Sequence, residues 1–133
     1  MNTTAQDIMS TELITLYEDE TLEDALKSLI NNRITGLPVL NRERKMVGVL
    51  SEYDIIKQAS KHKKLKPEIF QEKIQFSSAP FSVDPSTPLE EIVKHFIDHK
   101  YRRIAVLDKD QKLVGIITRR DLMRVFYYRA KLS

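Results

Sequence analysis

Residues 47–54 read VGVLSEYD, and residues 114–121 read VGIITRRD. Both stretches have an apolar run with a glycine at its second position, then a hydroxyl residue, then an aspartate three residues later. They lie 67 residues apart, and at this offset the sequence matches itself without a gap from Leu22 to Met123. The chain therefore contains two copies of one unit, which is too few for a solenoid. We expect the copies to pack with quasi-twofold symmetry and to form clefts between them.

Each copy has the hydrophobic pattern of one β-α-β-β-α unit. An extended stretch (residues 13–16 and 80–83) precedes a helix whose apolar side chains recur every three or four residues from Leu22 and Leu89. Two short apolar runs joined by a polar turn follow, which predicts a buried hairpin. The predicted hairpin strands are residues 37–40, 46–50, 104–107 and 113–117. The predicted fold class is therefore α/β of the mixed α+β kind.

Hydroxyl residues followed by an acidic residue predict where the helices begin. Ser51 with Asp54, and Thr118 with Asp121, predict a capping box for the final helix of each copy. The same carboxylates would then lie at the mouth of a cleft. We expect both roles, helix capping and ligand binding, for each aspartate.

The first helix of the second copy is expected to begin at Thr87. Thr87 is a favourable N-cap residue, Pro88 follows where its missing N–H costs nothing, and Glu90 completes a T-x-x-E box. Thr21 with Asp24 is the weaker version of this pattern in the first copy.

Two of the three glycines, Gly48 and Gly115, lie inside predicted strands. A glycine at such a position marks a bulge or a close approach by another backbone or a ligand. We favour packing between the copies over approach by a ligand.

Composition limits the function classes. The chain has 133 residues, of which 41% are hydrophobic and 31% charged, as in soluble globular proteins. No apolar run is long enough for a membrane span, and no secretory signal pattern opens the sequence, so we expect a cytoplasmic protein. The absence of cysteine excludes disulfides, thiolate nucleophiles and Cys-ligated metals. A net charge of +3 favours an anionic ligand but does not by itself imply nucleic acid.

Each copy resembles a CBS domain, and the pair resembles a Bateman module. The matching signatures in the first copy are DIMS at residues 7–10, ITGLPVLN at 34–41 and the VGVLSEYD stretch. In the second copy they are YRRIAVLD at residues 101–108 and the VGIITRRD stretch. Two such copies in register are a much more specific signal than one.

The resemblance divides the chain into three parts. A first repeat with its N-terminal segment covers residues 1–60, a connector covers 61–78, and a second repeat with a C-terminal helix covers 79–133. Together these parts form one Bateman module. Because the resemblance leaves little of the chain outside it, we expect a stand-alone sensor.

What the resemblance implies is a regulatory binding module and not an enzyme. Similar modules bind adenine nucleotides or related adenosyl compounds in clefts between their repeats, and they often form homodimers. AMP is the favoured ligand, with ADP, ATP or S-adenosylmethionine as alternatives. The expected partners are this ligand, a second copy of the chain and an unidentified protein target, with no catalytic cofactor and no membrane. The sequence contains no catalytic triad, P-loop or zinc-ligand pattern that would indicate catalysis.

The chemistry of a nucleotide indicates which residues would bind each of its parts, in agreement with the resemblance. A ribose diol donates hydrogen bonds, so a carboxylate suits it, and Asp54 and Asp121 match the family's ribose-contacting position. A phosphate needs a cation, and Arg102 and Arg103 match the family's phosphate-contacting position. In the family this contact comes from the opposite repeat, so we expect Asp54 to share its ligand with these arginines. The expected base contacts are Ile14, Ile34, Thr35, Phe81 and Tyr101, and the other candidates are Ser51, Thr118 and Arg120.

The two copies differ at the expected phosphate position. Residues 102–103 are Arg-Arg, whereas the matching residues 35–36 are Thr-Gly. The cleft around Asp121 therefore lacks the matching cation. Three other arginines could substitute for it: Arg33, Arg119 and Arg120. We expect the Asp54 cleft to prefer a phosphorylated ligand more strongly than the Asp121 cleft does.

Two other function classes stay open at this stage. Four lysines between residues 61 and 66 form either a solvated face or a contact with nucleic-acid phosphates, which makes a nucleic-acid-binding adaptor one alternative. The other alternative is a purely structural dimerisation module. Residues 126–129, FYYR, would then pack at a dimer interface rather than stack on bases.

His95 and His99 have the spacing of a metal-binding pair on a helix. No third ligand with suitable spacing follows them. We therefore expect no metal site there.

Overall fold

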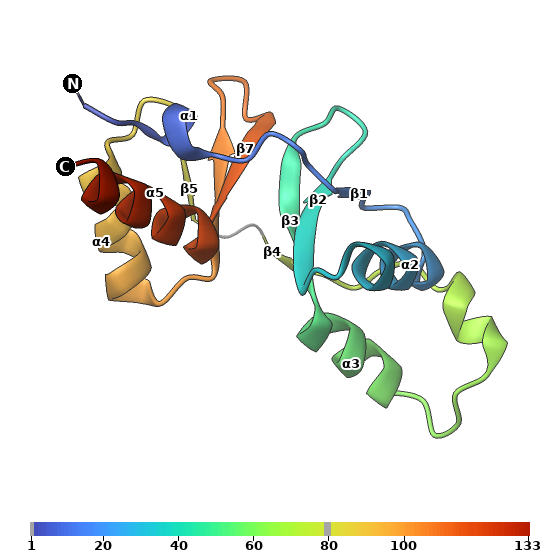
Figure 1. Cartoon of the computed structure of the whole chain (residues 1–133). Helices are drawn as coiled ribbons and strands as arrows, with labels where there is room; N and C mark the ends of the chain where they lie inside the picture. The colour runs from blue at the N-terminus through green and yellow to red at the C-terminus, as the bar shows by residue number, and fades with distance from the viewer. Residues whose placement is uncertain (1, 79–80) are drawn as a thin grey trace. The chain divides into compact units, whose positions relative to one another are not determined.

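The structure, a computed structural model, describes residues 2–78 and 81–133 (Figure 1). The chain divides into two compact units. The first unit is Ile14–Pro80, and the second combines Met1–Leu13 with Phe81–Ser133. Each unit has a small β-sheet and helices, so the predicted mixed α+β class is confirmed.

The first unit contains a four-stranded sheet in the order β1-β2-β3-β4. The strands are β1 (Leu16–Tyr17), β2 (Gly36–Leu40), β3 (Met46–Ser51) and β4 (Ser77–Ser78). Strands β1 and β2 are parallel, and the pairs β2–β3 and β3–β4 are antiparallel. The helices are α2 (Leu22–Asn32), α3 (Glu52–Ser60) and the 3-10 helix η1 (Pro67–Gln71).

The second unit repeats this plan with a three-stranded sheet in the order β5-β6-β7. Its strands are β5 (Ser82–Val83), β6 (Arg103–Leu107) and β7 (Leu113–Thr118), and its helices are α1 (Ala5–Ile8), α4 (Leu89–His99) and α5 (Arg119–Leu132). Pro80, the first residue of one predicted extended stretch, lies outside the described residues. The predicted strands and helices are otherwise present, with ends shifted by a few residues.

The backbone also repeats in its local conformation. Helices α2 and α4 both end at a residue in the left-handed region, Arg33 (φ 53°) and Lys100 (φ 55°). The hairpin turns also carry matching left-handed residues, Arg44 (φ 68°) and Gln111 (φ 64°). Both pairs lie 67 residues apart, so the repeat extends to backbone geometry.

Residues 2–13 precede the first repeat but pack in the second unit. Residues 61–78 precede the second repeat but pack in the first unit. Strand β4 pairs with β3, and in the second unit Ser10 takes the matching position against Ile116. The backbone N–H of Ser10 donates to the Ile116 carbonyl at 2.8 Å, and the N–H of Ile116 donates back at 3.0 Å. Figure 1 shows α1 beside β7 and α5. Residues 2–13 therefore extend the second sheet as β4 extends the first.

These segments also complete the two cores. Ala5, with no exposed surface, belongs to the core of the second unit. Ile69 and Ile74, from the predicted connector, belong to the core of the first unit with Leu22, Leu37 and Leu50. The predicted connector is thus a packed part of the first unit as well as a link between repeats. The division of the sequence at residues 61 and 78 follows the repeats, whereas the compact units follow this packing.

The two strand glycines explain how closely these segments approach the sheets. A Cβ atom at Gly48 would clash with the backbone carbonyl of Ser77 and the ring of Phe76. A Cβ atom at Gly115 would clash with the side chain of Met9. Phe76 and Met9 are repeat equivalents, so each glycine makes room for the same position of the segment before a repeat (residues 2–13 or 61–78), which we call the entering segment.

The predicted capping boxes on helices α2, α3 and α5 are confirmed. The predicted N-cap at Thr87 is wrong. Helix α4 begins at Leu89 with Pro88 as its N-cap, because the buried Thr87 hydroxyl instead accepts a hydrogen bond from the backbone N–H of Asp84 at 3.2 Å. The threonine thus stabilises the preceding turn.

We predict that Gly48→Ala destabilises the protein by about 1–3 kcal/mol and that Gly115→Ala costs less. The reason is that the Cβ at Gly48 meets a backbone carbonyl, which cannot move without breaking the β3–β4 pairing. At Gly115 the two nearest atoms are the Sδ and Cγ of Met9, which a rotamer change can move, and only the Met9 Cβ requires a small backbone shift. Urea unfolding of both variants measures the difference. An equal or larger loss in Gly115→Ala would contradict this explanation.

Candidate functional site

The predicted ligand-binding residues of the first unit gather at one end of its sheet. The parallel β1–β2 pairing brings the N-terminal ends of these strands together, and the pairing of Gly36 with Ser51 adds the C-terminal end of β3. The backbone N–H of Glu52 donates to the Thr35 carbonyl at 3.0 Å, which fixes the start of α3 at this edge. The predicted residues brought to this end are Ile14, Ile34, Thr35, Ser51 and Asp54.

Asp54 is held by hydrogen bonds to both of its oxygens. Its Oδ2 accepts from the backbone N–H of Ser51 at 2.9 Å and from the Ser51 hydroxyl at 3.0 Å. Its Oδ1 accepts from the Ser77 hydroxyl at 2.9 Å, and the residue is only 9% exposed. A carboxylate offers about four lone-pair sites, so Asp54 keeps little capacity for a further donor.

Asp121 occupies the same position in the second unit but keeps more capacity. Its Oδ2 accepts from the Thr118 backbone N–H at 2.7 Å and from the Thr118 hydroxyl at 3.0 Å. Within residues 2–78 and 81–133, no group donates a hydrogen bond to its Oδ1. The carboxylate is therefore oriented by its cap through Oδ2.

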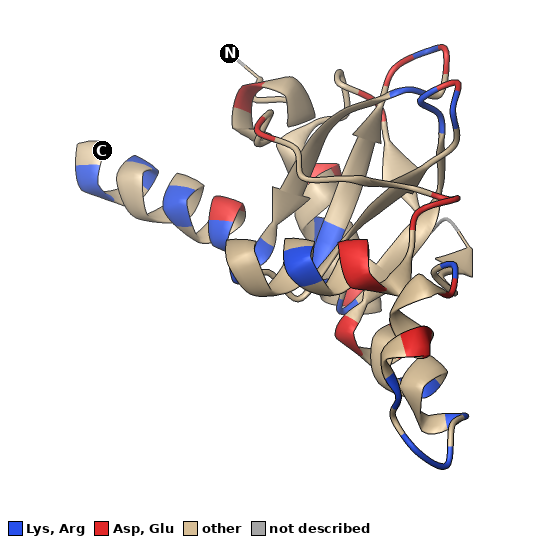
Figure 2. Ribbon diagram, turned by 90° about the vertical axis from the view of Figure 1, so that its right-hand side faces the viewer, with Lys and Arg blue, Asp and Glu red and all other residues tan. Residues whose placement is uncertain are grey.

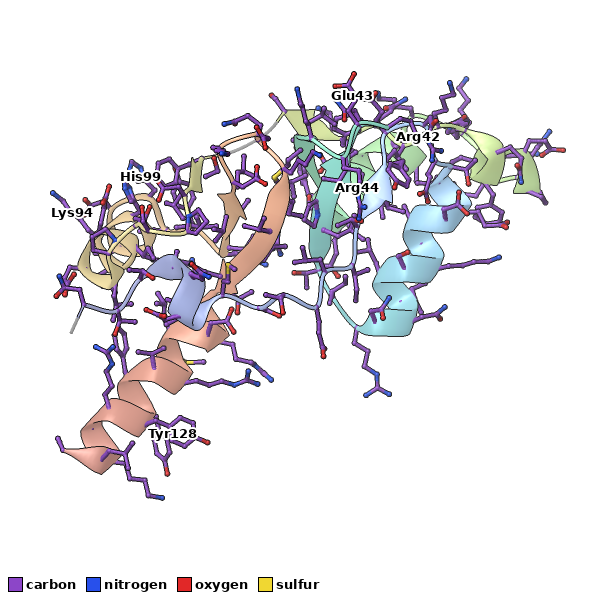
Figure 3. The ribbon with its side chains drawn as sticks, turned by 90° about the horizontal axis from the view of Figure 1, so that it is seen from above. Arg42, Glu43, Arg44, Lys94, His99 and Tyr128 are labelled. Atoms are coloured by element: carbon purple, nitrogen blue, oxygen red, sulfur yellow. The ribbon has the colours of Figure 1, made fainter. Side chains whose placement is uncertain are left out.

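Aromatic rings cluster at the matching end of the second sheet. Phe81 and Tyr101 lie parallel, with centroids 5.8 Å apart and planes 7° from each other. The ring centroids of His95 and Phe81 lie 4.2 Å apart, and those of His99 and Tyr101 lie 5.1 Å apart. Figure 3 labels His99 on α4. The matching positions in the first copy are Ile14, Ile34, Ser28 and Asn32. The aromatic cluster therefore distinguishes the second unit from the first.

The two histidines also stack on each other, with centroids 6.0 Å apart. In the part of the chain that the structure describes, no three His, Cys, Asp or Glu side chains form a group able to hold a metal ion. Both histidine rings take part in the aromatic packing with Phe81 and Tyr101.

The arginines of the second unit have different environments. Burial lowers the pKa of Arg103, and the positive charge of the exposed Arg102 lowers it further. A bound anion would offset this repulsion. Arg119 donates from Nε to the Tyr101 carbonyl at 2.8 Å and from Nη2 to the Lys100 carbonyl at 2.7 Å. These hydrogen bonds hold the Arg119 guanidinium against the backbone, so Arg119 is a poor substitute for a phosphate-binding cation.

The other two proposed substitutes lie in exposed positions. Arg33 ends helix α2 in the left-handed conformation, in the first unit, and Arg120 lies in the first turn of α5. Sequence reasoning missed Ser77, the direct partner of Asp54. Its repeat equivalent, Ser10, ends the DIMS stretch, so the 67-residue offset was the signal that pairs these two serines with the two aspartates.

Comparisons with known proteins place these features in a family. The family model described as "CBS domain" matches residues 5–61 and 73–128. A curated relative, the CBS domain-containing protein CBSX1, chloroplastic, of Arabidopsis thaliana, is 34% identical over 129 residues. That match covers 78% of this chain and 55% of CBSX1, so the chain spans about half the length of that relative.

Solved structures are similar over almost the whole chain. CBSX2 of Arabidopsis thaliana in complex with AMP has a TM-score of 0.79 and 28% identity, and the match covers 96% of this chain and 98% of that one. The CBS domain pair of protein MJ0100, in complex with 5′-methylthioadenosine and S-adenosyl-L-methionine, has a TM-score of 0.77 and 26% identity. That match covers 97% of this chain and 99% of the other. None of the helices in the described part of this chain has the length and apolar character needed to cross a membrane.

We predict that Asp54→Ala lowers the free energy of unfolding by about 2 kcal/mol and Asp121→Ala by about 1 kcal/mol. Both variants lose a helix cap, but only Asp54 also accepts a hydrogen bond from a segment that closes the sheet, through Ser77. Urea unfolding at pH 7 measures both values. The reverse order would show that Ser77 contributes nothing to stability.

Proposed function

The chain belongs to the CBS domain family, and from this membership we propose that it is a regulatory module that binds adenosyl compounds, with AMP the favoured ligand. The observation that carries the proposal is the oriented carboxylate at the start of the last helix in each unit. Asp54 and Asp121 are fixed by equivalent capping boxes, each at the matching end of its own unit's sheet. The AMP of the CBSX2 structure and the adenosyl ligands of the MJ0100 pair support this ligand class.

The ribose diol is the group that all these ligands share. A diol donates hydrogen bonds, and an ionised carboxylate accepts them strongly. Asp121 offers a free Oδ1, whereas Asp54 must share its remaining lone pair beside Ser77. In the proposed function, these carboxylates select a ribose over a ligand without hydroxyl groups.

The base and the phosphate have their own candidate contacts. Phe81 and Tyr101 present an aromatic surface on which adenine could stack, and the aliphatic Ile14 and Ile34 take these positions in the first unit. Arg102 and Arg103 are the proposed phosphate contacts, since an anion relieves the repulsion between them. We still predict that Asp54 and this arginine pair bind the same ligand.

A homodimer is part of the proposal. Large apolar side chains are exposed at matching positions of both units: Ile30 and Ile97 are each 69% exposed, and Ile56 and Met123 are 67% and 62% exposed. Such repeated exposure is typical of surfaces covered in an assembly. A ligand would regulate a partner only through different affinities for two states of this assembly. The protein target and the cytoplasmic location also stay predictions.

The nucleic-acid alternative rests on the lysine-rich loop between α3 and η1, coloured blue in Figure 2. Lys63, Lys64 and Lys66 are exposed, and Lys61 donates to the Gln75 side chain at 2.8 Å. Charge reversal in this loop therefore distinguishes nucleic-acid binding from binding of a small ligand.

Isothermal titration with AMP, ADP, ATP, S-adenosylmethionine and GMP tests the proposal. We expect Asp54→Asn and Asp121→Asn each to weaken binding at one site by about tenfold or more, equivalent to about 1.4 kcal/mol. An asparagine keeps an acceptor for the helix cap, so the fold should persist. We expect Asp54→Asn to reduce AMP binding more than Asp121→Asn does, because the arginine pair that contacts the phosphate is expected to share the ligand of Asp54.

Asp98→Asn is the matched control, because Asp98 is exposed on α4 and the first copy has Asn31 at this position. It should bind every ligand as the wild type does. Binding of no adenosyl ligand would overturn the proposal. If a short RNA then bound and Lys63→Glu with Lys64→Glu abolished that binding, the nucleic-acid alternative would replace it.

A further inference from the structure

The second unit contains a groove of about 630 Å3 between its N-terminal segment and helix α5. One wall is formed by residues from Thr3 to Ser10, and the other by one face of α5. Asp121, the proposed ribose contact, lies at the start of this helical wall. The groove is large enough for a ligand of nucleotide size.

The α5 face that lines the groove is unusually polar. Its residues are Asp121, Arg124, Val125, Tyr128 and Arg129, spaced three or four apart, which places them on one face of the helix. Figure 2 shows basic residues recurring along α5, and Figure 3 shows the Tyr128 ring beside the helix. A helix that packed its whole face onto a core would have apolar residues at these positions.

The matching face of α3 shows what this position does when it is closed. Gln58, the equivalent of Val125, is only 1% exposed. Its Nε2 donates to the Lys73 carbonyl at 3.0 Å and to Glu72 Oε1 at 3.2 Å, and its Oε1 accepts from the Gln75 backbone N–H at 3.0 Å. One buried amide thus joins α3 to the segment before β4.

The two residues that follow the end of α3 are used in the same way. Lys61, the equivalent of Tyr128, bonds to Gln75, and His62, the equivalent of Arg129, lies 2.9 Å from Glu72. At the start of the helix, Ser77 bonds to Asp54. These bonds join Asp54, Gln58, Lys61 and His62 to the neighbouring segment and so close the space between it and α3.

In the second unit these closing contacts are replaced. Val125 cannot form the hydrogen bonds of Gln58, and no described group bonds to Asp121 Oδ1. Arg129 donates a hydrogen bond to the hydroxyl of Thr3. An anion would accept a stronger hydrogen bond from Arg129 than this neutral hydroxyl does. Arg124 lines the groove one helical turn beyond Asp121.

We propose that this groove binds the phosphate chain of a nucleoside triphosphate whose ribose diol is held by Asp121. The inference rests on the proposed function and extends it. Arg124 and Arg129 lie about 4.5 Å and 12 Å beyond Asp121 along the helix axis, at a rise of about 1.5 Å per residue. Long arginine side chains at these intervals match a chain of phosphates that runs along α5.

One acidic residue on the opposite wall opposes this assignment. Asp7 lines the groove, but its Oδ2 accepts from the backbone N–H of Thr4 at 2.8 Å and the Thr4 hydroxyl at 3.2 Å, so it caps α1. The phosphates therefore follow the α5 side, where both arginines lie. The groove supplies the cation that the sequence comparison found missing beside Asp121, and it does so for a chain of phosphates rather than for a monophosphate.

Titration of wild type, Arg124→Gln and Lys57→Gln with adenosine, AMP, ATP and inorganic tripolyphosphate tests the inference. Lys57 is the repeat equivalent of Arg124 on α3, and its replacement removes the same charge from the closed face. We expect Arg124→Gln to weaken ATP binding about tenfold and to leave adenosine binding unchanged. Lys57→Gln should bind ATP as the wild type does. In NMR spectra, tripolyphosphate should shift the backbone amides of Ser10 and Arg124.

The outcomes separate the two proposals. If adenosine binds but ATP binds no more weakly to Arg124→Gln than to the wild type, the groove assignment is overturned and the proposed function stands. An equal loss in Lys57→Gln would also overturn it, since general charge would explain the effect. If tripolyphosphate shifts these amides but adenosine does not bind, the groove is a site for free polyphosphate and the nucleotide assignment is overturned. If none of the four ligands binds, both proposals fail.

Discussion

In each unit, an entering segment packs so closely against the sheet that only a glycine fits beneath it. Gly48 and Gly115 allow that approach, because a side chain at either position would collide with the segment. The resulting backbone pairing places Ser77 beside Asp54 and brings Ser10 into the groove with Asp121. The segments thus decide both which residues complete each core and which groups surround each carboxylate.

The two units use one framework for different purposes. In the first unit, the buried Gln58 and the Ser77 hydroxyl close the space between the last helix and the entering segment. In the second unit, Val125 replaces the glutamine and the space stays open beside two arginines. Since the backbone plan is the same, the difference comes from a few side chains on one helix face. The two units therefore share a backbone plan and differ in whether side chains fill the space beside the last helix.

The sequence predicted the repeated plan because the 67-residue offset preserves apolar spacing and the S/T-x-x-D boxes at Ser51 and Thr118. It did not predict that Thr87 stabilises a turn, since a T-P-x-E pattern fits either use. It also did not predict where residues 2–13 pack, because sequence order favours the nearer repeat. The groove was missed for a related reason: α5 alone shows basic residues, and only the comparison with Gln58 in three dimensions reveals an open face.

Hydrogen exchange of the backbone amides, in the wild type and in Ala5→Asp, tests most directly whether residues 2–13 are part of the second unit. Ala5 is fully buried in that unit, so a carboxylate there should undock the segment. We expect the Ser10 and Ile116 amides to be protected in the wild type, and we expect the variant to lose protection in β7 and α5 but not in β2 and β3. Unprotected Ser10 and Ile116 amides in the wild type, or an equal loss in β2 and β3, would contradict it.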